Sequence, residues 1–302
     1  MRQTGRCIVC ACVLLFSAPA FGQSSVVEVF GGASIWKAFQ ESIYDAPYTP
    51  ADVDTYPFFS GNDLRNAASQ SLALNAGTSL ALSTGVNVFL HHTWGFQFLF
   101  DYSGVALSGT NVPHEVEFTY LSIQPPSYIG VERTNVWSFP VSDTIGEMDQ
   151  RTFSMNGVVR FAEESSIAGS VSAGLSYTRV RLEAEPLAAA GAWTGGHGVI
   201  FVDLSEFSVL SDSAHSLGVN LGGTIDISVG PSLTLFADAR LFRVGRPTPT
   251  LQPDRLISDP LFNNGESDST ILSRITNHVA LQPAELEPSY ARLLVGIKWS
   301  LR

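Results

Sequence analysis

The chain has no cysteine beyond residue 12. Its three cysteines, Cys7, Cys10 and Cys12, all lie in the first apolar segment. The remainder of the chain therefore has no disulfide, no thiolate nucleophile and no thiolate metal site. Other interactions, such as a closed network of backbone hydrogen bonds, must hold the fold together.

Basic residues are scarce as well. The sequence has 17 Lys and Arg residues against 28 Asp and Glu residues, and its formal net charge is −11. Proteins that bind nucleic acid need a basic surface. The composition therefore argues against a nucleic acid as partner.

Long apolar runs are missing except at the start. A basic N-terminus and an apolar stretch from Ile8 to Phe16 precede small residues that suit signal-peptidase cleavage. This pattern predicts a signal peptide over residues 1–22 and one secreted domain over residues 23–302. Beyond the signal, no apolar run reaches the roughly 20 residues that a transmembrane helix needs.

What the sequence has instead is period-2 alternation, most clearly over residues 214–246. The apolar face of the first arm consists of Leu217, Val219, Leu221, Gly223, Ile225, Ile227 and Val229. Polar and ionisable residues occupy the opposite face, and a second alternating arm follows the turn Gly230–Ser232. Such alternation predicts a β-hairpin. In an outer-membrane barrel the apolar face meets lipid and the polar face lines the lumen.

Six further segments alternate in the same way, which gives eight predicted strands in all. The six cover residues 26–37, 78–91, 95–107, 151–162, 167–182 and 289–302. Short turns alternate with long polar segments, which cover residues 38–77, 108–150, 183–213 and 247–288. Outer-membrane barrels have this asymmetry between short periplasmic turns and long extracellular loops.

We therefore predict an all-β fold, an eight-stranded antiparallel up-and-down transmembrane β-barrel with four long extracellular loops. A soluble eight-stranded barrel of the lipocalin type, with a ligand inside, is the alternative fold. Residues 116–123 and 197–204 are ambiguous, because they suit either hairpin arms above the membrane or additional spans.

The end of the chain adds a local motif, Gly296 to Leu301. Gly296, Trp299 and Leu301 match the C-terminal signal by which outer-membrane barrels are delivered to their assembly machinery, although the chain ends on Arg302 where an aromatic residue is usual. With this motif the sequence resembles the small outer-membrane β-barrels of the OmpA-like or OmpX-like type. The resemblance implies a place in the outer membrane of a Gram-negative-type bacterium, with its lipid and the barrel assembly machinery as partners.

Eight ionisable residues fall on the predicted lumen faces. They are Glu28, Asp101, Arg160, Asp226, Asp238, Arg240, Arg292 and Lys298. An eight-stranded barrel is only wide enough for side chains to fill it. Because an unpaired buried charge is costly, we expect an ion-paired network that plugs the barrel, with a narrow ion path as the alternative.

Six basic residues fall where predicted strands meet the long segments. They are Lys37, Arg151, Arg179, Arg181, Arg243 and Arg246. Arginine binds phosphate in bidentate geometry, so these residues are candidates for contact with lipopolysaccharide at the outer rim. Pairing with the neighbouring acidic segments is the alternative.

Catalytic and metal-binding patterns are weak. His215–Ser216 and His91–His92 are adjacent pairs, and adjacent side chains on a strand point to opposite faces. We therefore predict no enzymatic activity, no cofactor and no metal site. Six aromatic residues are candidates for membrane-interface anchors, namely Trp36, Trp94, Trp137, Trp299, Tyr102 and Tyr177.

The expected role is structural or surface-interactive, possible partners being met through the extracellular loops. A small porin is the first alternative, and a soluble lipocalin-like periplasmic carrier is the second.

Overall fold

The structure is a computed structural model, which describes ten segments of the chain. They are residues 26–40, 42–53, 65–111, 114–124, 129–139, 143–161, 166–195, 199–258, 267–281 and 286–301. The predicted signal peptide, residues 1–22, lies outside the described residues. Within these segments, no helix combines the length and apolar character needed to cross a membrane.

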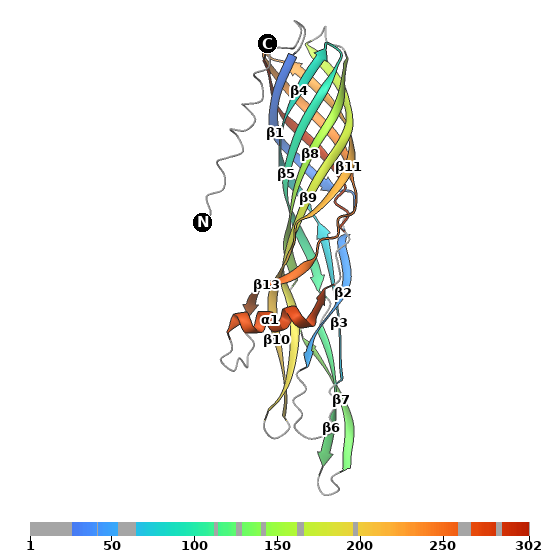
Figure 1. The fold of residues 1–302 in the computed structure, drawn as a ribbon, viewed down its shortest axis with the longest axis vertical. Helices are drawn as coiled ribbons and strands as arrows, with labels where there is room; N and C mark the ends of the chain where they lie inside the picture. The colour runs from blue at the N-terminus through green and yellow to red at the C-terminus, as the bar shows by residue number, and fades with distance from the viewer. Residues whose placement is uncertain are drawn as a thin grey trace.

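Eight strands form a closed antiparallel barrel (Figure 1). They are β1 (Val26–Ala38), β4 (Thr78–His91), β5 (Trp94–Asn111), β8 (Thr144–Phe161), β9 (Ile167–Gly195), β11 (Ala214–Ser228), β12 (Leu233–Val244) and β15 (Tyr290–Leu301). Each strand pairs with the next one in this order, and β15 pairs with β1, which closes the ring. The predicted eight-stranded barrel is confirmed.

The four long segments are not simple loops, and the predicted loop lengths are not confirmed. Their described parts contain β2 (Ser42–Val53), β3 (Arg65–Ala76), β6 (His114–Gln124), β7 (Ile129–Phe139), β10 (Val199–Ser211), β13 (Leu251–Ser258), β14 (Val279–Leu281) and α1 (Asp268–His278). These elements continue the sheet beyond one end of the barrel (Figure 1), and we call this part the extension. Residues 116–123 lie in the β6–β7 hairpin and residues 199–204 in β10, so both are hairpin arms outside the ring, while residues 197 and 198 lie outside the described residues.

The strands that run from the barrel into the extension exchange their polar and apolar faces on the way. In the barrel part of β9, Leu175 points outward and is 69% exposed, whereas Ser176 points inward and is 2% exposed. Past Tyr177 the outward residue Arg181 is charged, and the inward residue Leu182 is completely buried. The barrel is therefore apolar outside and polar inside, and the extension has the opposite arrangement.

The exposed apolar surface forms a belt around the barrel. It includes Val29, Ile35, Leu82, Phe98, Met155, Leu175, Leu221, Ile225, Leu241 and Val295. A soluble carrier of the lipocalin type would turn these faces inward, so the orientation argues against that alternative. A barrel that presents such a belt is suited to lipid.

The extension has a hydrophobic core that is continuous with buried apolar side chains of the barrel and is built from the inward side chains of the continuing strands and from the added elements. The core includes Val105, Leu107, Met148, Val180, Leu182, Leu187, Phe207, Val209, Val244, Leu251 and Leu286. Burial of this apolar surface stabilises the extension as a folded structure rather than as a set of loops.

Candidate functional site

The lumen holds all eight of the charged residues that the alternation placed there. Four are acidic (Glu28, Asp101, Asp226, Asp238) and four are basic (Arg160, Arg240, Arg292, Lys298), and each forms an ion pair. The group as a whole is therefore electrically balanced. It divides into a central cluster and two pairs nearer the short turns.

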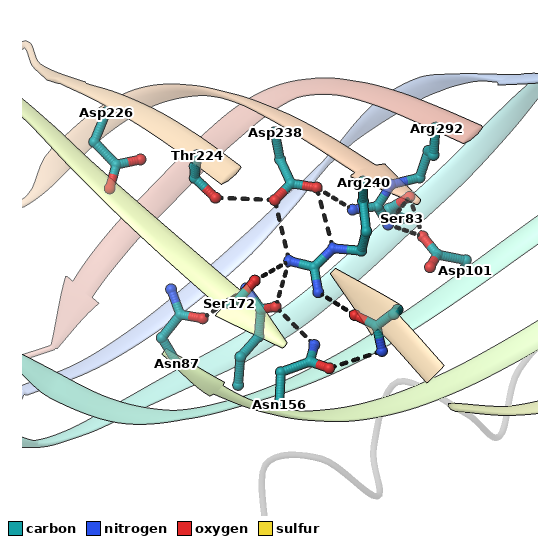
Figure 2. Close-up of polar contacts among 12 residues, drawn as sticks. Ser83, Asn87, Asp101, Asn156, Ser172, Thr224, Asp226, Asp238, Arg240 and Arg292 are labelled. Atoms are coloured by element: carbon teal, nitrogen blue, oxygen red, sulfur yellow. Dashed lines mark hydrogen bonds and ion pairs between the residues drawn. The ribbon is translucent and has the colours of Figure 1, made fainter. Parts of the chain in front are cut away.

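Asp238 on β12 is the centre of the first cluster (Figure 2). Arg292 on β15 contacts both Asp238 and Asp101, and Arg240 lies 3.1 Å from Asp238 between Nη2 and Oδ2. Ser83 donates a hydrogen bond of 2.5 Å to Asp101. These side chains are almost entirely buried, so their charges depend on one another for compensation.

Arg240 also crosses the lumen to the opposite wall. Its guanidinium donates to Asn220 Oδ1 at 2.7 Å, to Gln97 Oε1 at 2.8 Å and to Ser172 Oγ at 2.7 Å. The guanidinium thus joins strands β5, β9, β11 and β12 within one hydrogen-bonded network (Figure 2). Networks of this kind rigidify a buried polar interior when their members are satisfied.

Amide side chains connect the central cluster to the end with the short turns. Asn156 bridges Gln97 and Asn220, and Gln97 donates to Asn87 at 3.1 Å. Asn87 in turn donates to Glu28 at 3.0 Å. Sequence reasoning missed these amides because it followed only ionisable residues, although the same alternation places them on the lumen face.

Two further ion pairs lie toward the short turns. Glu28 and Arg160 are 2.6 Å apart, and the Arg160 guanidinium lies 3.8 Å from the centre of the Phe89 ring. Lys298 Nζ lies 2.6 Å from Asp226 and 4.8 Å from the centre of the Phe236 ring. Both cations therefore have a carboxylate and an aromatic face as partners.

A cluster of aromatic side chains lies inside the barrel on the side of the extension. Trp36 stacks on Tyr290 with ring centres 5.5 Å apart, and Phe242 stacks on Tyr290 at 4.3 Å. All three side chains are buried. The interpretation of Trp36 as a membrane-interface anchor was wrong, because its side chain points into the lumen.

Gly222 and Gly223 give a test of how tightly the network fills the lumen. A Cβ on the inward residue Gly222 would lie 2.8 Å from Arg240 Nε, which cannot retreat without losing its hydrogen bonds. A Cβ on the outward residue Gly223 has its nearest neighbour 3.9 Å away. We expect Gly222→Ala to lower the free energy of unfolding by about 1–3 kcal/mol and Gly223→Ala to change it by less than about 0.5 kcal/mol.

Urea titration of both variants in phospholipid vesicles measures this difference. Equal effects of the two substitutions would show that Arg240 is free to move and that the lumen is loosely filled.

The six basic rim residues lie at the junction of barrel and extension, but they are not equivalent. Arg243 and Arg246 lie 3.4 Å and 3.2 Å from the Glu287 carboxylate. Arg151 on β8 and Arg179 on β9 are exposed and lie opposite each other in the strand register. Arg181 on β9 lies opposite Asp149 on β8 in the same register. Lys37 is exposed on β1.

The predicted assembly motif lies at the end of β15. Trp299 and Leu301 point outward and are exposed, as Trp94, Tyr102 and Tyr177 are. Gly296 faces Gly32 across β1 and β15, and a Cβ there would approach the Gly31 carbonyl oxygen to 2.2 Å. Close packing of β1 against β15 thus explains why residue 296 is a glycine, independently of any recognition signal. The side chain of Trp137 lies outside the described residues.

The histidines considered for catalysis are exposed. His215 stacks on Tyr177, and its Nδ1 lies 2.7 Å from the Tyr177 hydroxyl. The rings of His91 and His92 contact each other at a turn with a tilt of 41° between their planes. Among the described residues, no group of three or more His, Cys, Asp or Glu side chains is arranged to hold a metal ion.

Comparison with known proteins gives structural likenesses only. No family model and no curated protein matches the sequence. The outer membrane protein OprG from Pseudomonas aeruginosa matches with a TM-score of 0.41 and 10% identity, over 92% of this chain and 97% of that chain. The attachment invasion locus protein Ail of Yersinia pestis matches with a TM-score of 0.34 and 8% identity, over 92% of this chain and 99% of that chain.

Neisserial surface protein A matches with a TM-score of 0.35 and 11% identity, over 91% of this chain and 96% of that chain. At these TM-scores, the assignment of the fold rests on the strand pairing and on the exposed apolar belt.

Proposed function

We propose that this protein is a non-enzymatic outer-membrane barrel that anchors a folded extension at the cell surface, with a structural or surface-interaction role. The apolar belt supports the place in the membrane, because a water-soluble protein rarely exposes so large an apolar surface. The short turns would face the periplasm and the extension would face the outside. The partners would be outer-membrane lipid, lipopolysaccharide, the assembly machinery and an extracellular molecule met by the extension.

The filled lumen is the observation that carries this proposal. Charged and amide side chains bond to one another across the barrel, and the cluster of Trp36, Tyr290 and Phe242 lies between them and the apolar core of the extension. An ion that entered would have to break buried ion pairs and then cross apolar side chains. A closed anchor fits this arrangement better than a small porin does.

Heat-modifiability and conductance of the purified protein test the proposal together. We expect the protein in the outer-membrane fraction, a gel band that shifts only after boiling, and no stable conductance steps in planar bilayers. A shifting band with steady conductance would favour the porin instead. A periplasmic protein without a shift would contradict the barrel's place in the membrane.

A further inference from the structure

Arg151 and Arg179 form an unusual pair on the outer surface. They are direct cross-strand partners on β8 and β9, and both are exposed. Like charges directly opposite each other destabilise a sheet. In the described part of the chain, neither guanidinium is in an ion pair with a carboxylate: Arg179 donates to Ser213 Oγ at 2.6 Å, and Arg151 lies over the Tyr102 ring at 5.6 Å.

The pair lies where the apolar belt ends. The adjacent outward cross-strand pair on the barrel side is Phe153 with Tyr177, and successive outward pairs are roughly 7 Å apart along a strand. On the other side, Arg181 pairs across from Asp149. The two guanidinium groups are therefore the charges nearest to the belt on these two strands.

Neighbouring strands add polar and aromatic groups at the same level. Tyr102 on β5 pairs with Arg151, and His215 on β11 pairs with Arg179. The His215 ring stacks on the Tyr177 ring with centres 5.5 Å apart. Arg151 and Arg179 are thus flanked by flat, amphipathic side chains, which suit the boundary between hydrocarbon and water.

The neighbouring part of the rim, on β12 beside β11, differs in its charge balance. There the guanidinium groups of Arg243 and Arg246 share the Glu287 carboxylate. At the level next to the apolar belt, the β8–β9 sector consequently presents two positive charges, with Asp149 and the Glu147–Glu183 cross-strand pair farther from the belt, whereas in the β12 sector two guanidinium groups share one carboxylate. A partner that carries both negative charge and hydrocarbon would be drawn to the first sector.

We propose that Arg151 and Arg179 bind a phosphate of a phosphorylated outer-leaflet lipid, whose acyl chains lie along the belt below them. This inference rests on the proposed place in the outer membrane. Two guanidinium groups suit a phosphate because each offers parallel N–H donors to its oxygens. Met155 and Leu175 provide the apolar surface for the acyl chains. They are exposed on the same two strands and form the next outward pair after Phe153 and Tyr177, farther from the extension.

The test compares two double variants of the full chain that change the net charge equally. R151Q/R179Q removes the proposed site. R243Q/R255Q removes two exposed arginines that lie near Glu287 and Glu185. Each protein is titrated in detergent micelles with diphosphoryl lipid A, and with lipid A from which the phosphates have been removed.

We expect R151Q/R179Q to bind diphosphoryl lipid A about tenfold more weakly than the wild type, because charge-assisted hydrogen bonds are lost. R243Q/R255Q should bind as the wild type does. The dephosphorylated lipid should bind the wild type more weakly than the phosphorylated one does.

Equal binding by the two double variants would overturn the proposal. The proposal would also be overturned if inorganic pyrophosphate bound the wild type as tightly as the lipid does, because the ligand would then be a free anion. It would likewise be overturned if the wild type preferred heparin, because the ligand would then be a sulfated glycan. The heat-dependent gel shift distinguishes failure of the lipid site from failure of the membrane barrel. If R151Q/R179Q keeps the shift and binds lipid A as the wild type does, only the site is rejected. If the wild type shows no shift, the membrane barrel itself is rejected.

Discussion

Replacement of Arg292 by methionine should lower the free energy of unfolding by about 3–5 kcal/mol. Arg292 is the cation that contacts both Asp101 and Asp238, and its side chain is 1% exposed. Methionine fills a similar volume but leaves two carboxylates in a buried interior with one cation fewer. Urea titration in phospholipid vesicles, followed by tryptophan fluorescence, measures the loss.

The matched control is Arg243→Met on β12. Arg243 also pairs with a carboxylate, but its side chain is 70% exposed. Exposed ion pairs contribute about 0–1 kcal/mol, so this change should cost no more than that. If Arg292→Met cost as little, the lumen would have to be filled with water that screens its charges, and the closed-anchor proposal would lose its main support.

Replacement of Ile225 by arginine should cost about 2–4 kcal/mol, because it places a cation on the lipid face near the middle of the belt. Ile225 lies on β11, points outward and is 59% exposed. The expected result is a lower yield of the heat-modifiable form and a lower urea midpoint in vesicles.

Leu217→Arg is the control for depth. Leu217 lies on the same strand and face, is 74% exposed and pairs across from Tyr177 at the end of the belt. Arginine near the interface costs only about 0–1 kcal/mol. The neighbouring inward residue Thr224 is unsuitable as a control, because it is buried and donates to Asp238 at 2.9 Å. Equal losses at Ile225 and Leu217 would contradict the assignment of the membrane to this belt.

The barrel was predictable from the sequence because one physical rule governs it from end to end. Each spanning strand separates lipid from a polar lumen, so side chains alternate without interruption, as from Leu217 to Val229 on β11. The same parity assigns eight charged residues to the inward face, and in the structure these side chains lie in the lumen. It also placed Trp36 on the face of Glu28 and Phe30, and that parity, not the preference of tryptophan for membrane interfaces, decided where its side chain lies.

The extension was not predictable in the same way, because the rule reverses within single strands. On β9 the apolar residues change from odd to even positions between Tyr177 and Val180. A search for one continuous alternation takes this change as the end of the strand and assigns the remainder to a loop. Contacts between distant elements, such as Phe207 and Leu251 in one core, then decide the structure of the remainder.

The partners of individual charges were likewise beyond the sequence. Alternation predicts which face of the sheet a side chain occupies but not its position along the barrel axis. An ion pair between two strands depends on both. Arg151 and Arg179 were grouped with Arg243 and Arg246 as rim residues of one kind. Only the register of β8 against β9 shows that the first two oppose each other, and only the position of Glu287 shows that the last two share a carboxylate.

The exchange of polar and apolar faces on β5, β8 and β9 also sets how deep the protein sits. Sinking by one cross-strand pair would carry Arg151 and Arg179 into hydrocarbon, and rising by one would bring Phe153 and Tyr177 into water. Both displacements cost free energy, so the bilayer holds the molecule at one level. Since the same strands continue into the extension, its far end would stand at a constant distance from the membrane in the proposed orientation, and a partner would have to reach that level.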